Sequence, residues 1–215
     1  MAPRTRPDPA VTRDRLIQAG IRLFGEHGYK ATTTRMLADA AGANIGSIAY
    51  HFDNKHGLYL AAARYIADQL RQRLALGEAG EPMVPEERDA ALVKLRAITR
   101  RMVRTFAADD DCRQWLLLVM REQVHPSEAF EILQAQAFGV VQATLGSLIA
   151  RLTDRPVDDR RVILETHTLV GQIVFFLVGR EPLLRRLGMA AFDEATLADI
   201  EAVVDGHLRR YEGSR

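Results

Sequence analysis

The stretch TTTRMLADAAGANIGSIAYHFDNK, residues 32–55, decides how this sequence is interpreted. Thr32 or Thr33 can cap a helix of two turns, because the side-chain oxygen accepts a hydrogen bond from a free backbone N–H group of the first turn. Gly42 follows in a tight turn, where glycine adopts a positive φ at little cost. A second short helix is predicted over Ile45–His51. Two short helices joined by a turn that contains glycine indicate a helix-turn-helix.

The second short helix offers polar groups on one side. Asn44 is suited to cap it, and Ile45 and Ile48 are expected to pack inward. The polar positions on or near the opposite side are Asn44, Ser47, Tyr50 and His51. A recognition helix needs such groups, since it meets phosphates and base edges. The spacing by itself leaves a purely structural helical hairpin open as an alternative.

Charge is distributed unevenly along the chain. Residues 1–75 hold 11 Lys and Arg against 6 Asp and Glu, a net charge of +5, whereas the remaining residues hold 18 against 22, a net charge of −4. A basic first third indicates a segment that meets a polyanion. Arg4 and Arg6, in a Pro-rich arm expected to be disordered, are candidates to reach the neighbouring groove or backbone of DNA, and Lys55 is a candidate phosphate contact.

Composition excludes several classes of protein. The single cysteine, Cys112, excludes an intrachain disulfide framework and zinc sites built from several thiolates. The first ten residues hold no apolar core, so no signal peptide is expected. The longest apolar run, Leu169–Val178, is too short to span a bilayer and predicts a buried helix. We expect a cytoplasmic protein with no metal, no cofactor and no membrane partner.

Helical periodicity recurs almost everywhere and strand alternation nowhere, so the fold class is all-α with about nine helices. Thr12 is expected to cap the first helix and Gly28 to end it. Ser127 is expected to cap one continuous helix whose apolar stripe runs from Phe130 to Leu152. The predicted organisation is a basic arm (1–10), a helix-turn-helix domain (11–54), a connecting helix (55–76), a linker (77–85) and a ligand-binding and dimerisation domain (86–215).

The N-terminal part resembles the DNA-binding domain of TetR-family regulators over about residues 11–66. The matching motifs are IQAGIRLF (17–24), GY (28–29), TTxRxLA (32–38), AGAN (41–44) and YHFxxKxxL (50–58). The C-terminal part is similar to the CecR-like branch of that family. This similarity rests on Arg121-Glu122 before Pro126 and on the motif GQxxFF (171–176).

The resemblance implies a helical DNA-binding domain, a larger regulatory domain and a homodimer on palindromic operator DNA. The candidate DNA-binding residues are Thr33, Arg35, Asn44, Ser47, Tyr50, His51, Lys55, Arg4 and Arg6.

The sequence departs from the family pattern at two places in the recognition helix. Ala49 stands where the family often has an aromatic residue, and the recognition helix has no Arg or Lys for bidentate contacts to guanine. Affinity is therefore expected to depend on phosphate contacts and DNA shape.

The last two long apolar helices are the expected dimer interface. A helix that is apolar all round needs cover on every face, and one subunit of this size does not readily supply it. The candidate interface residues are Leu169, Gly171, Val174, Leu177, Leu197, Ile200, Val204 and Leu208. The alternative is that these residues form the core of a single subunit.

Polar and aromatic residues in apolar surroundings are candidates for an effector site that takes a hydrophobic or amphipathic small molecule. They are Trp115, Arg121, Glu122, His125, Phe138, His167, Gln172 and Phe175. The aromatic members suit a protein core better than an effector site, and Arg121 with Glu122 can simply pair with each other.

The sequence is compatible to different degrees with three functions. The first is a ligand-responsive regulator, most often a repressor, in which effector binding shifts the population of dimers between one that fits the operator and one that does not. The second is a helical scaffold whose head does not bind DNA. The third is an enzyme. The sequence does not favour it, because it contains no nucleophile elbow, phosphate loop, metal motif or carboxylate pair at useful spacing.

Overall fold

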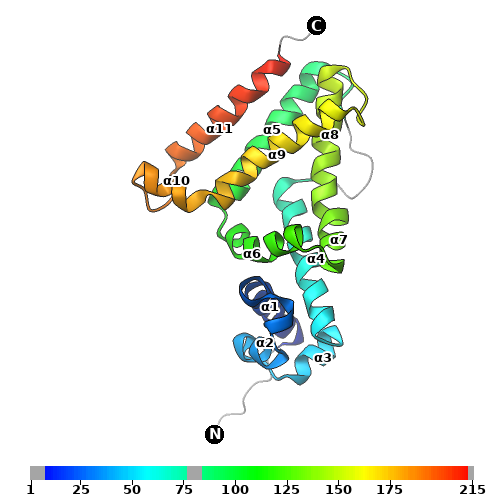
Figure 1. The fold of residues 1–215 in the computed structure, drawn as a ribbon, viewed down its shortest axis with the longest axis vertical. Coiled ribbons are helices and arrows are strands. Elements are labelled where there is room, and N and C mark those ends of the chain that lie inside the picture. The colour runs from blue at the N-terminus through cyan, green and yellow to red at the C-terminus, as the bar shows by residue number, and fades with distance from the viewer. Residues whose placement is uncertain (1–7, 77–83, 213–215) are drawn as a thin grey trace. The chain divides into compact units, whose positions relative to one another are not determined.

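The computed structural model describes residues 8–76 and 84–212, and these are almost entirely helical. Eleven α-helical segments, α1–α11, occur among the described residues (Figure 1). They form two compact units. Unit 1 is Met1–Gln69 with Gln114–Gln134, and unit 2 is Leu70–Arg113 with Ala135–Arg215. The predicted all-α class is confirmed, while the units are discontinuous in sequence.

In unit 1 the first helix is longer than predicted. Helix α1 spans Pro9–Ala31, and its N-cap is Asp8, whose side chain accepts a hydrogen bond from the N–H of Ala10. Thr12 therefore lies inside the helix and does not cap it. Gly28 has φ 80° and ψ 165°, outside the helical range, so the regular helix is interrupted where the sequence predicted its end. A short helical piece to Ala31 follows this kink.

Three helices follow α1 in unit 1: α2 (Thr34–Ala41), α3 (Gly46–Phe52) and the first part of α4 (Lys55–Leu74). Helix α1 contacts both α2 and α3. The fully buried side chains of this part of the unit include Leu16, Ile17, Ile21, Phe24, Leu37, Ile48, Leu58 and Ile66. The three-helix head thus has an apolar core that fixes the direction in which α3 presents its outer face.

Unit 1 also contains a segment that comes from much later in the chain. Helix α6 (Asp110–Val124) contributes its residues from Gln114 onward, and α7 (Glu128–Leu133) follows. Ser127 caps α7, because its hydroxyl accepts a hydrogen bond from the N–H of Ala129. The predicted Ser127 cap is confirmed.

Unit 2 is built mainly on four long helices (Figure 1). They are α5 (Arg88–Ala108), α8 (Gly139–Thr153), α9 (Arg160–Val178) and α11 (Glu194–Leu208). Helix α5 contacts the other three, and α8 contacts α9. Their inward apolar side chains form one cluster that includes Leu95, Leu145, Ile173 and Val204. Burial of this apolar surface is the main term that stabilises the unit.

Two shorter features of unit 2 differ from the sequence prediction. A π-helical turn, Gln134–Phe138, separates α7 from α8 where one continuous helix was expected. Helix α10 (Arg180–Leu187), which directly follows α9, was not predicted. A 3-10 turn, Arg209–Tyr211, closes the chain after α11. The described residues therefore contain more helices than the nine or so that the sequence predicted.

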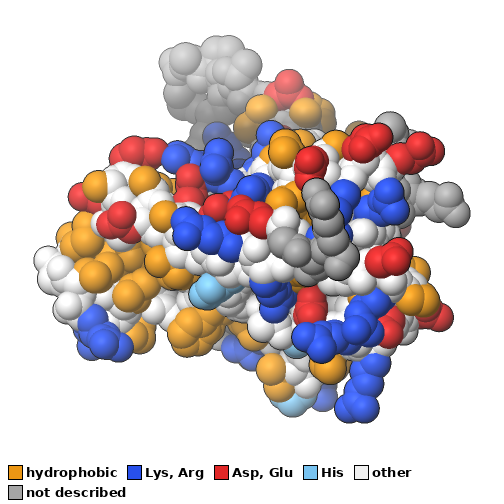
Figure 2. All heavy atoms as spheres, turned by 90° about the horizontal axis from the view of Figure 1, so that it is seen from above, with side chains coloured by type: hydrophobic (Ala, Val, Ile, Leu, Met, Phe, Trp, Pro, Cys, Tyr) orange, Lys and Arg blue, Asp and Glu red, His pale blue; other side chains and the backbone are white. Residues whose placement is uncertain are grey.

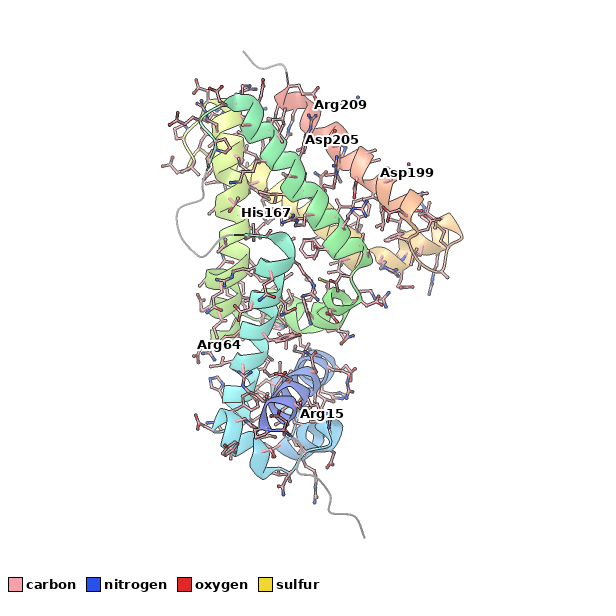
Figure 3. All side chains as sticks on the ribbon, turned by 180° about the vertical axis from the view of Figure 1, so that it is seen from behind. Arg15, Arg64, His167, Asp199, Asp205 and Arg209 are labelled. Carbon is pink, nitrogen blue, oxygen red and sulfur yellow. The ribbon has the colours of Figure 1, made fainter. Side chains whose placement is uncertain are left out.

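Ion pairs join α11 to α5 along their length. Arg96 Nε lies 2.8 Å from an oxygen of Asp205, and Arg104 Nε lies 2.5 Å from an oxygen of Glu201. Asp199 and Asp205 follow one another along α11 in Figure 3, and Arg209 lies directly after its C-terminal end. The face seen from above in Figure 2 carries basic and acidic side chains side by side. This mixture gives that face no strong charge of one sign.

The residues predicted for a dimer interface lie mostly inside unit 2. Six of them are buried in this chain alone, at 8% exposure or less: Leu169, Leu177, Leu197, Ile200, Val204 and Leu208. Gly171 is exposed and Val174 is half-buried. The apolar stripe read from the sequence is therefore the inward face of each helix, because the hydrophobic stripe of a helix packs first on its own domain.

The outward face of α9 is also apolar. Phe175 is 66% exposed, Leu164 is 55% exposed and Val178 is 44% exposed. By length and composition alone, α9 and the segment Glu128–Thr153 could cross a membrane. Core helices of soluble proteins satisfy the same criterion, so this observation is weak evidence for a membrane span.

Candidate nucleic-acid interface

The turn between α2 and α3 is fixed by local hydrogen bonds. Thr33 caps α2, because its hydroxyl accepts a hydrogen bond of 3.2 Å from the N–H of Met36. Gly42 has φ 60°, and its N–H is bonded to carbonyl oxygens of the last turn of α2. The Thr33 cap and the positive φ of Gly42 were both predicted from sequence. They set the angle at which the chain enters α3.

Asn44 holds the start of α3. Its Oδ1 accepts a hydrogen bond of 2.9 Å from the N–H of Gly46, so one of the unpaired donors at this helix end is satisfied. Ile48 and Phe52 anchor the helix in the core. Ile45 does not join them: it is 47% exposed. The expectation that Ile45 packs inward is wrong, because the Asn44 turn places residue 45 before the first helical residue.

The outward side of the helix pair carries most of the predicted DNA-binding side chains. Tyr50 is 78% exposed. Thr33, Arg35 and Asn44 are exposed as well, while Ser47 and His51 are half-buried. The rings of Tyr50 and His51 stand edge to face with centroids 4.8 Å apart, which limits the freedom of both side chains. The structure thus brings polar groups of α2 and α3 onto accessible surface. Arg4 and Arg6 lie outside the described residues.

Lys55 lies at the first residue of α4 and has partners inside unit 1. Its Nζ donates to the carbonyl oxygens of Tyr29 and Thr32, both at 2.9 Å, and lies 4.3 Å from the centroid of the Tyr29 ring. A cation is unfavourable at the positive end of a helix dipole, and these carbonyl groups offset that effect. Lys55 therefore ties α4 to the end of α1 and to Thr32, which follows it.

The junction of α3 and α4 contains residues that sequence reasoning missed. Asp53 has φ 64°, and Asn54 Oδ1 accepts a hydrogen bond of 3.0 Å from the N–H of Gly57. A Cβ atom on Gly57 would lie 2.0 Å from the carbonyl oxygen of Phe52. Asn54 is a recognisable helix cap. The requirement for glycine at 57 has no local signal, since it depends on where the Phe52 carbonyl group points.

A second group of residues joins α6 to α1. Arg121 donates through Nε to the carbonyl oxygen of Gly25 at 2.6 Å and through a terminal nitrogen to that of Glu26 at 2.9 Å. A Cβ atom on Gly25 would lie 3.1 Å from Cβ of Leu117 and from N of Leu118. Glycine thus permits close approach of the two helices, and the guanidinium group of Arg121 binds carbonyl groups next to the Gly28 kink.

Glu122 joins α6 to α4. It is 3% exposed, its Oε1 accepts a hydrogen bond from the hydroxyl of Tyr59, and its Oε2 accepts bonds from N and Oγ of Ser127. Burial raises the pKa of Tyr59, and the hydrogen bond to Glu122 raises it further, so the phenol stays protonated as the donor. Tyr59 also packs edge to face on Phe24 of α1. We call the contacts of Arg121 and Glu122 with α1 and α4 the α6 clasp.

The remaining candidates for an effector site are spread over both units. In unit 1, Trp115 is buried with its ring 6.4 Å from that of Tyr65, and His125 is exposed. In unit 2, Phe138 is half-buried and Phe175 is exposed.

His167 is exposed on α9 (Figure 3), and Gln172 is hydrogen-bonded to His207 at 2.7 Å. A small polar hollow between α5 and α11 has room for about one water molecule. Within the described residues no group of three or more His, Cys, Asp or Glu side chains is placed to hold a metal ion.

Family models match both ends of the chain. Residues 16–62 match the model described as bacterial regulatory proteins, tetR family, and residues 91–212 match the C-terminal domain of the HTH-type transcriptional dual regulator CecR.

Individual relatives agree with these matches. The chain is 35% identical over 212 residues to the HTH-type transcriptional dual regulator CecR of Shigella flexneri, with 94% of each chain covered. It is 39% identical over 85 residues to the HTH-type transcriptional repressor KstR2 of Mycolicibacterium smegmatis, which covers 39% of this chain and 42% of the relative.

Solved structures show the same fold. A putative transcriptional regulator from Pseudomonas aeruginosa has a TM-score of 0.64 at 21% identity, with 96% of this chain and 97% of that chain covered. The structure of AibR in complex with isovaleryl coenzyme A and operator DNA has a TM-score of 0.61 at 15% identity, with 93% and 97% covered.

Proposed function

Because the chain belongs to the TetR family of bacterial transcriptional regulators, with a CecR-type C-terminal domain, we propose that it is a cytoplasmic homodimeric repressor. It binds palindromic operator DNA and responds to a small-molecule effector. One observation carries the DNA-binding part of this proposal. The polar groups of α2 and α3 lie on the accessible side of a helix pair whose other side is anchored in an apolar core.

In the proposed complex α3 enters the major groove and α2 crosses the backbone, as in other helix-turn-helix proteins. Tyr50, Thr33 and Arg35 donate to phosphate oxygens or base edges. Lys55 acts mainly by positioning, since its ammonium group already donates to Tyr29 and Thr32. A two-fold axis would place the two recognition helices about 34–36 Å apart, one turn of DNA.

We assign the dimer interface to the outward face of α9 and α11. Phe175 on α9 is 66% exposed and Val203 on α11 is 57% exposed. Small residues, Gly171 and Ala202, are also exposed on these helices, and small residues permit close helix approach. Such an apolar surface, contributed equally by two copies, suits an isologous contact.

Sedimentation equilibrium tests this interface. Phe175→Arg is expected to shift the protein from dimer to monomer, because a charge on each copy would face its equivalent across the two-fold axis. Val93→Arg is the matched control, since Val93 is 65% exposed but lies on α5. Equal dimer stability for both variants would contradict the assignment.

The effector is proposed to be hydrophobic or amphipathic, with a site in the regulatory part. The neighbour AibR was solved with isovaleryl coenzyme A, which supports a small-molecule effector here without giving its identity. An effector can shift the operator equilibrium only by its difference in affinity for the two states of the dimer. Screening ligands by the increase in melting temperature, followed by DNA titration with each hit, tests this part.

A further inference from the structure

We propose that Ile45 reads thymine in the operator by packing on its 5-methyl group. This inference rests on the proposed entry of α3 into the major groove and names what that helix selects there. The starting observation is an isoleucine that is 47% exposed at the residue directly before α3, whereas Ile48, one turn later, is 2% exposed.

The position of Ile45 is the one that meets base edges. In helix-turn-helix proteins the N-terminal residues of the recognition helix contact the bases. Asn44 fixes this end of α3 through its bond to the N–H of Gly46. Its neighbours Gly46 and Ala49 are also exposed and carry little or no side chain. These small neighbours leave room for the Ile45 side chain to approach a groove.

The chemistry of the groove then limits the partner of Ile45. Base edges in the major groove present donors and acceptors, and the thymine 5-methyl is their distinctive apolar group. An isoleucine pressed on donors or acceptors would leave them without hydrogen-bond partners, which is costly. Packing on the methyl group avoids that cost and removes apolar surface from water.

The polar side chains nearby are compatible with the same base. Asn44 uses Oδ1 within the protein, so its free group is the amide NH₂, a donor. Thymine offers the O4 acceptor beside its methyl group. Helix α3, GSIAYHF, has no Lys or Arg, so it lacks the side chains that select guanine by paired hydrogen bonds.

The experiment compares thymine with uracil, which pairs identically but lacks the 5-methyl group. The full chain is first used to select sites from a random-sequence duplex library made with thymine. Each selected thymine is then replaced by deoxyuridine, one symmetric pair at a time. At one such pair, removing a single methyl group is expected to weaken wild-type binding about fourfold. Removing the methyl groups of both half-sites is expected to weaken it roughly tenfold or more.

Two variants assign the effect to a side chain. Ile45→Ala is expected to bind the thymine and uracil sites equally, whereas Val11→Ala keeps the wild-type difference. Val11 is 44% exposed, but it lies on α1.

Equal wild-type affinity for thymine and uracil at every position, with salt-sensitive binding retained, overturns this inference alone. A difference that persists in Ile45→Ala overturns it as well. Absence of any salt-sensitive duplex binding overturns the proposed function together with the inference.

Discussion

The outer face of α3 and the α6 clasp belong to the same unit but are built in opposite ways. Helix α3 leaves its outer side chains exposed, with Tyr50 at 78%, and its start is held by a local bond between Asn44 and Gly46, just as Thr33 caps the neighbouring α2. The clasp uses a buried carboxylate, Glu122. Its other member, Arg121, contacts carbonyl groups of α1 that lie more than 90 residues earlier in the sequence. The proposed DNA-contacting surface is thus built from exposed side chains, whereas the clasp is built from long-range contacts inside unit 1.

This difference has a consequence for mutations. Changes on the outer face of α3 are expected to alter DNA affinity without altering stability. Changes in the clasp or at the α3–α4 junction are expected to alter stability first. The two regions can therefore be distinguished by measuring unfolding and DNA binding on the same variants.

The largest effect is expected at the α3–α4 junction. Gly57→Ala places a Cβ atom 2.0 Å from the carbonyl oxygen of Phe52, so the backbone of the junction must move. We expect a loss of about 3 kcal/mol in the free energy of unfolding, at the upper end for overpacking. Urea denaturation followed by circular dichroism measures it.

Gly42→Ala is the control for this variant. Gly42 has φ 60°, but nothing lies within 4 Å of an added Cβ atom. Its expected cost is about 1 kcal/mol, the strain of a left-handed alanine. An equal loss in both variants would mean that steric contact with Phe52 is not the cause.

A smaller effect is expected from the clasp. Glu122→Ala removes the acceptor of the buried Tyr59 hydroxyl and of two donors of Ser127, which should cost about 1–3 kcal/mol in the free energy of unfolding. Glu128→Ala is the matched control. Glu128 pairs with His56 at 3.0 Å, but both side chains are largely exposed, so little change is expected.

The double variant sharpens this prediction. If Glu122 acts through Tyr59, Tyr59→Phe combined with Glu122→Ala costs less than the sum of the two single changes. Additive costs would separate the two residues and contradict the hydrogen bond as the source of the effect.

The smallest effect is a dependence of stability on alkaline pH. The pKa of Tyr59 is raised in the folded state by burial and by Glu122. Below its ordinary value of about 10, the phenol is protonated in both states and contributes no pH dependence. Above that value the unfolded state ionises first, so stability falls as pH rises.

Tyr59→Phe should show a shallower fall in the urea midpoint between about pH 9 and 11. The residual slope comes from other groups, since burial raises the pKa of Tyr211 and of Cys112 to about 12. Identical slopes in the variant and the wild type would show that Tyr59 ionises equally in both states.

The sequence predicted well what depends on neighbouring residues. The Thr33 and Ser127 caps, the positive φ of Gly42 and the all-α class all follow from local signals, and the structure confirms them. The family resemblance is confirmed by matches at both ends of the chain. The sequence did not show which side of α9 faces the core, because a helix that is apolar all round has no single apolar stripe.

Long-range contacts were outside the reach of sequence patterns. Nothing near Arg121 and Glu122 indicates that they meet Gly25 and Tyr59, so they were interpreted as candidate effector contacts. The assignment of residues 114–134 to unit 1 has the same cause. Ile45 was placed inward because isoleucine is usually buried, whereas its position before the first turn of α3 leaves it exposed.

We propose that the outer face of α3 binds duplex DNA. Fluorescence anisotropy of a selected duplex, titrated with wild type and with Tyr50→Ala between about 50 and 200 mM salt, tests it most directly. We expect wild-type affinity to fall steeply with salt and Tyr50→Ala to bind roughly tenfold more weakly at each concentration, with an unchanged unfolding curve. Equal affinity of the two proteins would show that Tyr50 on the outer face of α3 does not contact DNA.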